Sequence, residues 1–149
     1  MCLYVKNKEP KIADKNIKCY KIVMKYNGNY FSPYTHELIK DECINGKKDL
    51  VPSELFVPKN IFHQEYNYFG SIGYSGYIAG CMIHTFKYEK NAITDNDCVA
   101  PFANCNYGNN CLFEVYECII PKGTEYYEGT DGEWLGYASK AIKFIKKIY

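Results

Sequence analysis

The segment Ile17–Tyr34 reads Ile-Lys-Cys-Tyr-Lys-Ile-Val-Met-Lys-Tyr-Asn-Gly-Asn-Tyr-Phe-Ser-Pro-Tyr and carries the strongest structural signal in the chain. Apolar and lysine positions largely alternate over Ile17–Tyr26, as in a β-strand with one buried face. Asn27-Gly28 follows, and this dipeptide is preferred in two-residue type I′ turns. Tyr30–Tyr34 supplies the returning strand. The segment therefore predicts a β-hairpin.

Two more dipeptides of this kind mark turns further along the chain. Asp131-Gly132 separates Thr124–Glu128 from the C-terminal segment, and Asn45-Gly46 marks a third turn. The run 111–120 is long, β-branched and aromatic, so we expect it to form the central strand. Pro121 ends this strand, and the turn after it leads into the next one.

The same run holds two acidic residues, Glu114 and Glu117. Alternate residues of a strand face opposite sides of the sheet, so these two carboxylates cannot act together from one cleft.

Helices are harder to locate. Phe86–Ile93 can form two helical turns with Thr85 as N-cap, and His36–Cys43 can form another short helix. The segment 141–148 fits helix and strand periodicity equally well. No repeat or long linker divides the chain. The sequence predicts one α+β domain over residues 1–149, with a mostly antiparallel sheet and one or two short helices.

Composition narrows the class of protein. A chain of 149 residues can bury a core without disulfide staples, and 47% hydrophobic with 23% charged residues is neither disordered nor fibrous. A formal net charge of +1 gives no field for bulk nucleic-acid binding or an anionic membrane surface. No run approaches the roughly 20 apolar residues of a transmembrane helix.

All 18 basic residues are lysine, so any anion site must use lysine, backbone N–H groups, hydroxyls or helix N-termini instead of the arginine fork. An AT-rich genome would also favour this composition.

The eight cysteines are even in number, as a disulfide framework requires. The first residues, however, contain no apolar run of secretory length, so we expect a cytoplasmic protein with reduced thiols. The run Cys98, Cys105, Cys111 and Cys118 has spacers of six, five and six residues, unlike the close pairs of zinc sites. We expect no metal and no cofactor, and we expect Cys111 and Cys118 to be buried.

Glycine and tyrosine alternate with other residues over the segment 66–80. It matches neither the dinucleotide fingerprint nor a Walker loop, but its backbone N–H groups and tyrosine rings suit a base or a sugar. An ordinary surface loop with tyrosines packed back on the domain is the alternative. The candidate ligand residues here are Tyr68, Gly73, Tyr74, Gly76 and Tyr77.

His84 and Thr85 follow this segment at the expected strand-to-helix junction. They can present an imidazole and a hydroxyl to a ligand, beside a helix N-terminus that favours negative charge. A packed core histidine is the plainer interpretation. Lys122 is a further candidate for a contact with phosphates.

The chain resembles a group of small uncharacterised proteins from bacteriophages and gut bacteria. The similarity rests on Met1–Tyr4, on Lys11–Ala13 before Cys19–Lys21, on the segment 80–86 around His84, on the segment 117–129, and on Tyr137–Ser139. It implies no known activity. It does imply that the closing segment is a strand. If a phage encodes this chain, its compartment is the host cytoplasm.

A second resemblance is local. Glu117–Thr124 is similar to the glutamate strand of ADP-ribosyltransferases. The resemblance implies that Glu117 is the catalytic glutamate and that His84 and Thr85 lie near the NAD-binding histidine. Val115 replaces the companion acidic residue of that family, and the absence of arginine excludes its arginine-dependent branch.

The sequence favours a non-enzymatic binding protein of phage or mobile-element type, which sequesters a nucleotide-like signalling ligand of a host defence system. No complete catalytic constellation is present, which argues against an enzyme. An ADP-ribosyltransferase-like or NAD-processing enzyme that uses Glu117 and His84 is the alternative. A protein–protein adaptor with tyrosine anchors is a further one.

Overall fold

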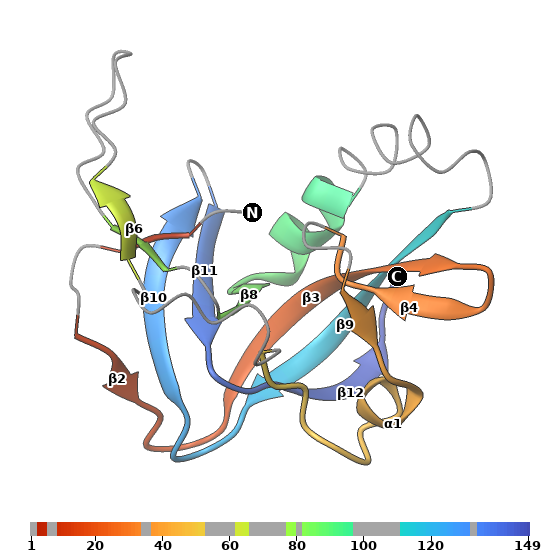
Figure 1. Cartoon of the computed structure of the whole chain (residues 1–149), viewed down its shortest axis with the longest axis horizontal. Helices are drawn as coiled ribbons and strands as arrows, with labels where there is room; N and C mark the ends of the chain where they lie inside the picture. Colours follow the sequence, from red (N-terminus) through yellow and green to blue (C-terminus); the bar gives the residue numbers. More distant parts are fainter. Residues whose placement is uncertain are drawn as a thin grey trace.

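The computed structural model describes residues 3–5, 9–33, 37–52, 62–65, 77–79, 82–96, 111–131 and 134–149. These residues form a mostly antiparallel β-sheet with two short helices, which confirms the predicted α+β class (Figure 1). The helices are α1 (Asp41–Ile44) and the helical residues 89–96. The strands are β1 (Tyr4–Val5), β2 (Lys11–Ile12), β3 (Ile17–Tyr26), β4 (Asn29–Phe31), β5 (Leu38–Ile39), β6 (Phe62–Glu65), β7 (Tyr77–Ala79), β8 (Ile83–Phe86), β9 (Leu112–Ile120), β10 (Glu125–Asp131), β11 (Trp134–Ser139) and β12 (Lys143–Lys147).

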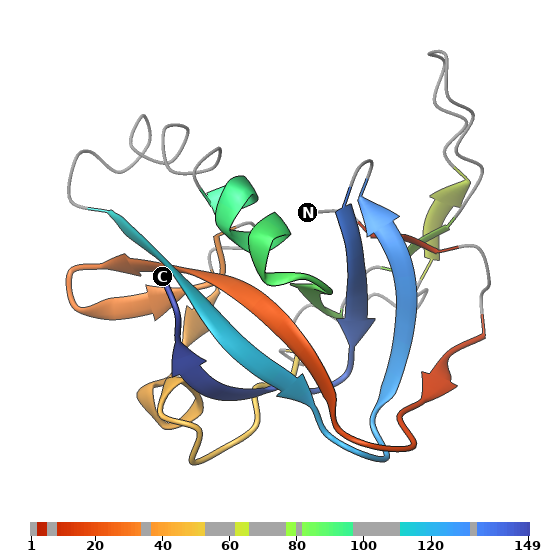
Figure 2. The ribbon, with the colours of Figure 1, turned by 180° about the vertical axis from the view of Figure 1, so that it is seen from behind.

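The strands follow the order β12-β9-β3-β8-β11-β10-β1-β7-β6. In addition, β2 pairs with β10, β4 pairs with β3, and β5 pairs with β4. The sheet is strongly curved, as both sides of the molecule show (Figure 1 and Figure 2). Within the described residues, no helix has the length and hydrophobicity needed to span a membrane.

The predicted hairpins are present. Asn27 (φ 48°) and Gly28 (φ 79°) both have positive φ, as a type I′ turn requires, and Tyr26 pairs with Asn29 across it. Asp131 pairs with Trp134, which joins β10 and β11 as the second hairpin. The turn residues 132–133 between them lie outside the described part.

The turn at Asn45-Gly46 is also confirmed, and it needs its glycine. Gly46 has a φ of +67°, and a Cβ at this position would lie 2.7 Å from the backbone oxygen of Phe144. Any side chain here would clash with β12, because a backbone oxygen cannot move aside as a flexible side chain can.

Strand β9 matches the predicted run but not its predicted place. It pairs with β3 on one side and with the C-terminal strand β12 on the other, so it is second from one end of the order. Its prediction as the central strand was therefore wrong. The C-terminal segment is a strand: Phe144 is buried and its neighbour Ile145 is exposed, as alternation requires.

Both expected helices have different bounds from those predicted. Strand β8 continues through Phe86, which is buried and pairs with Gly136, and the helix begins only at residue 89. Thr85 is consequently a strand residue and not an N-cap. In the other segment, Leu38 and Ile39 pair with β4 as a strand, and only Asp41–Ile44 is helical.

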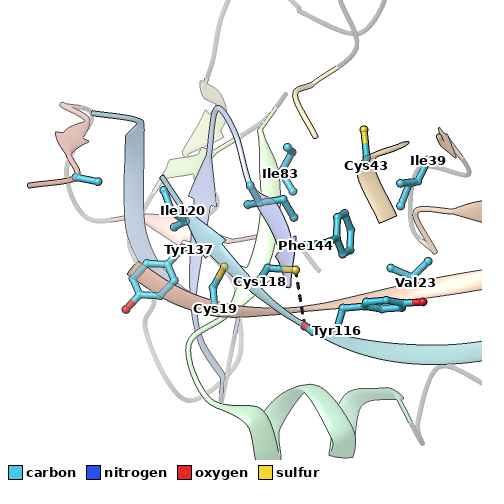
Figure 3. Packing of buried hydrophobic residues seen from close by; sticks show 12 residues of the cluster. Cys19, Val23, Ile39, Cys43, Ile83, Tyr116, Cys118, Ile120, Tyr137 and Phe144 are labelled. Atoms are coloured by element: carbon cyan, nitrogen blue, oxygen red, sulfur yellow. Dashed lines mark hydrogen bonds between the residues drawn. The ribbon is translucent and has the colours of Figure 1, made fainter. Parts of the chain in front are cut away.

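The two faces of the sheet carry separate apolar clusters. The first face includes Cys19, Val23, Cys118 and Phe144, and α1 and β5 pack against it through Cys43 and Ile39 (Figure 3). The opposite face has a cluster made of Tyr20, Ile22, Phe86, Ala92 and Val115, in which Ala92 comes from the helical segment 89–96. Strand β3 therefore has a buried residue on each side along much of its length.

Candidate functional site

Most of the glycine–tyrosine segment 66–80 lies outside the residues that the structure describes. Tyr68, Gly73, Tyr74 and Gly76 lie outside the described residues. Tyr77 begins β7, where its backbone pairs with Val5 of β1. Strand β7 is separated from β8 by β1, β10 and β11 in the sheet order, so Tyr77 is not a neighbour of Thr85 within the sheet.

His84 and Thr85 are consecutive residues of β8, so their side chains face opposite sides of the sheet. Thr85 is fully buried and pairs with Tyr137 of β11. His84 pairs with Ala138 and is only partly buried. The two side chains therefore cannot contact one ligand from the same side.

Strand register instead brings Thr85 to Lys21. Tyr20 pairs with Phe86, and continuing this antiparallel register by one residue sets Lys21 opposite Thr85. Lys21 pairs with Tyr116 on its other side. The result is a transverse line of polar residues on the face of the first cluster, which we call the polar row: Lys147, Tyr116, Lys21, Thr85, Tyr137 and Glu128.

Lys21 is the unusual member of the polar row. Its side chain is buried, and its Nζ donates a hydrogen bond of 3.2 Å to the backbone oxygen of His84. Among the described residues it takes part in no ion pair. Burial lowers the pKa of Lys21 to about 8, and the opposing effects of Cys118, Cys19 and Glu37 offset this only in part.

Two thiols, those of Cys118 and Cys19, are the groups that act most on Lys21 after burial itself. Cys19 and Cys118 are buried register partners on β3 and β9, and Figure 3 shows them on the same side of the sheet. Burial raises the pKa of Cys19 to about 12 and also raises the pKa of Cys118, so both are thiols at neutral pH. The Thr85 hydroxyl has only a weak contact with Cys19 and no hydrogen-bond partner of good geometry among the described residues.

The predicted burial of two cysteines is confirmed. Cys111 and Cys118 are buried, and both are free, as are Cys19 and Cys43. No group of three or more potential metal ligands occurs among the described residues.

Charged groups pair at both ends of the polar row. At one end, Lys87 Nζ lies 2.6 Å from Glu128 Oε1, and Lys11 Nζ lies 3.4 Å from Glu128 Oε2. The hydrogen bond from Lys87 lowers the pKa of Glu128. The middle of the row, around Lys21, has no ion pair with any residue that the structure describes.

At the other end, Glu114 accepts hydrogen bonds from Tyr116 and from Lys147, both at 2.8 Å. Burial alone would raise the pKa of Glu114, but these two hydrogen bonds bring it below its usual value. Burial and, to a smaller extent, the hydrogen bond to Glu114 raise the pKa of Tyr116, so its hydroxyl stays protonated.

Glu117 lies on the opposite face from Lys21 and is already paired. Its Oε2 is 3.1 Å from Lys18 Nζ and 3.9 Å from Lys146 Nζ, and its side chain is 15% exposed. Lys122 is exposed at the turn between β9 and β10, where its backbone N–H donates to Asn16 Oδ1. It lies beyond Ile120 on β9, at least about 13 Å along the strand from Tyr116 in the polar row.

Sequence reasoning missed Lys21 as a site residue. The signal available was its position in the alternation: Lys21 lies between Cys19 and Val23 on one face, whereas Lys18 has the other parity. A lysine flanked by apolar residues on the same face of a strand is rarely buried, which is the signal that singles out Lys21.

No protein-family model, no curated protein and no solved structure matches this chain.

Proposed function

We propose that this protein is a non-enzymatic small-molecule binding protein that holds an anionic, nucleotide-like ligand at the middle of the polar row. In this proposal Lys21 and Thr85 contact a phosphate of the ligand, and Tyr137 and Tyr116 flank them. Sequestration of a signalling nucleotide of a host defence system is the use we propose, in line with the resemblance to phage proteins.

One observation carries this proposal. The Lys21 ammonium is buried, yet it has one carbonyl acceptor and no carboxylate within ion-pair distance among the described residues. An ammonium has three donors, and a buried charge without a counter-charge is costly. A bound anion would supply both the charge and the missing acceptors. The neighbouring Thr85 hydroxyl is a further donor for the same anion.

The segment over this face consists of short elements. Ile39 of β5 and Cys43 of α1 pack on the first cluster, and α1 has only four residues. Short elements open at a lower free energy than long strands and helices, so we propose this segment as the route of ligand entry.

Calorimetry on the purified protein with NAD, ADP-ribose and cyclic nucleotides tests this proposal. We expect one of these classes to bind, and Lys21→Met to weaken its binding about 10- to 100-fold, because a charge-assisted contact is worth about 1.5–3 kcal/mol. Lys18→Met is the matched control: Lys18 is an exposed lysine of the same strand, and its loss should leave affinity unchanged. Native mass spectrometry should detect any ligand that copurifies. Absence of heat with every nucleotide, together with a ligand-free mass, would contradict the proposal.

An NAD-processing enzyme is the second candidate, and one geometric observation favours it. Tyr20 pairs with both Glu117 and Phe86, so these three residues share a face, and His84 lies on the same face two residues from Phe86. In that case Glu117 would stabilise an oxocarbenium-like transition state. The enzyme predicts nicotinamide release from NAD that Glu117→Gln lowers at least about 100-fold. Equal release by the two proteins would exclude Glu117 from catalysis.

A further inference from the structure

Lys21 differs from the other described lysines in its surroundings. It is the one described lysine that is buried, whereas seven others, Lys11, Lys18, Lys48, Lys87, Lys140, Lys146 and Lys147, each pair with a glutamate. Among the described residues, the groups that act on Lys21 are the backbone oxygen of His84, the thiols of Cys118 and Cys19 and the carboxylate of Glu37, and Thr85 lies opposite Lys21 in the strand register. None of these groups forms an ion pair with Lys21 within the described part of the chain, so burial raises the fraction of the neutral amine, which is the nucleophilic form, above that of an exposed lysine.

We infer that Lys21 is a covalent anchor for ligands that carry an aldehyde or a reactive ketone beside an anionic group. This inference rests on the proposed function, because it assigns the same site a more specific class of ligand. The neutral amine attacks the carbonyl carbon, and the carbonyl oxygen takes a proton from the nitrogen to give a carbinolamine. The C–O bond then breaks, the oxygen leaves as water with a second proton from the nitrogen, and a C=N bond forms. No oxidant or reductant is needed.

The side chains beside Lys21 fit this step. The dehydration of a carbinolamine needs a group that passes a proton from nitrogen to oxygen, and a hydroxyl can both donate and accept. Thr85 offers a buried hydroxyl that has no strong hydrogen bond to break among the described residues. The burial that lowers the pKa of Lys21 leaves a substantial neutral fraction near pH 7.5, whereas the pKa values of Lys18 and Lys87 are raised by their glutamate partners.

The probe for this inference is pyridoxal 5′-phosphate, which joins an aldehyde to a phosphate. The folded protein is treated with one equivalent, reduced with borohydride, and mapped by peptide mass spectrometry. We expect one adduct per chain, at Lys21, at least tenfold above any other lysine. Labelling of Lys21 should rise with pH to half its maximum near 8, whereas an exposed lysine such as Lys18 should still be rising at pH 10. Lys21→Arg keeps the charge and should give no adduct at position 21.

One further variant, together with the nucleotide-binding experiment, makes the outcomes decisive. Thr85→Val, which is close in shape, should slow imine formation several-fold while the final adduct stays at Lys21. Adducts spread over the exposed lysines, with Lys21 unmodified in protein that is folded by circular dichroism, would overturn the covalent anchor. If nucleotides bind in a Lys21-dependent way but no imine is trapped, the anchor fails and the proposed function stands. If an imine is trapped and no nucleotide binds, the anchor stands and the nucleotide class fails.

Discussion

Lys21→Met is expected to stabilise the ligand-free protein at pH 7 by about 2 kcal/mol, even though it removes a hydrogen bond. The wild-type protein holds a buried ammonium with a carbonyl as its acceptor and no ion-pair partner among the described residues. Replacing buried charge with an apolar side chain of similar length is often neutral or stabilising by about 1–4 kcal/mol. Unfolding by guanidinium chloride, followed by circular dichroism, measures the difference.

The difference in stability between the wild type and Lys21→Met should also depend on pH, in a direction that the pKa of Lys21 determines. The amine of Lys21 has a pKa of about 8 when folded and 10.5 in its ordinary state. Above pH 8 the unfolded wild-type chain therefore binds more protons than the folded one, so wild-type stability rises with pH. The advantage of Lys21→Met should shrink by about 1 kcal/mol between pH 8 and pH 9.

The titration of other groups around Lys21 affects the wild type and Lys21→Met alike, so it cancels in the difference between their stabilities. Cys19, Cys118 and Glu37 are the titratable groups whose charges act on Lys21, and both proteins contain them. Lys18→Met serves as the control, because Lys18 is exposed and its pKa is raised instead of lowered. Curves for wild type and Lys21→Met that stay parallel from pH 7 to pH 9 would show that Lys21 is solvated in solution.

Local sequence signals predicted the hairpins because the chemistry that makes them is local. Asn27-Gly28 adopts positive φ at both positions with little strain, and the flanking alternation then fixes the pairing of β3 with β4. The strand over 112–120 was equally predictable, since β-branched and aromatic residues dominate it.

The conformation of segments that depend on partners far away in the sequence was not predictable. Leu38 and Ile39 were expected in a helix, but they pair with Tyr30 and Phe31 of β4, and nothing within the segment itself encodes that pairing. Phe86 likewise was expected in a helix, and its burial between Tyr20 and Gly136 keeps it in β8. In both cases tertiary pairing overrides a short helical pattern.

The residues of the candidate site were likewise predictable only where the signal is local in the sequence. Thr85 was identified from its place in the sequence, but its partner Lys21 lies 64 residues earlier and meets it only through the register of β3 with β8. His84 was identified with Thr85 because the two are adjacent in sequence, although a strand separates their side chains onto opposite faces. Which faces of β3 are buried becomes known only when α1, β5 and the helical segment 89–96 are in place.

Phe144→Ala is expected to have the largest effect on stability, about 3–5 kcal/mol of destabilisation. Phe144 is 1% exposed on β12, and its ring meets the ring of Tyr116 edge to face at a centroid distance of 5.4 Å. Its removal leaves a cavity beside the polar row, where Figure 3 shows the two rings side by side. Ile145→Ala is the matched control: Ile145 follows Phe144 on the same strand but is 49% exposed, so its loss should cost about 1 kcal/mol or less.

The cavity left by Phe144→Ala should also lower nucleotide affinity, although Phe144 itself is not a proposed ligand contact. Tyr116 loses the ring that holds it, although its hydroxyl still donates to Glu114, and Tyr116 is the register partner of Lys21. At a temperature where Phe144→Ala remains folded, we therefore expect nucleotide affinity to fall several-fold, with no change for Ile145→Ala. Chemical denaturation gives the first quantity and calorimetry the second. Equal destabilisation by the two substitutions would mean that β12 does not present Phe144 to the interior, because only a buried side chain leaves a cavity.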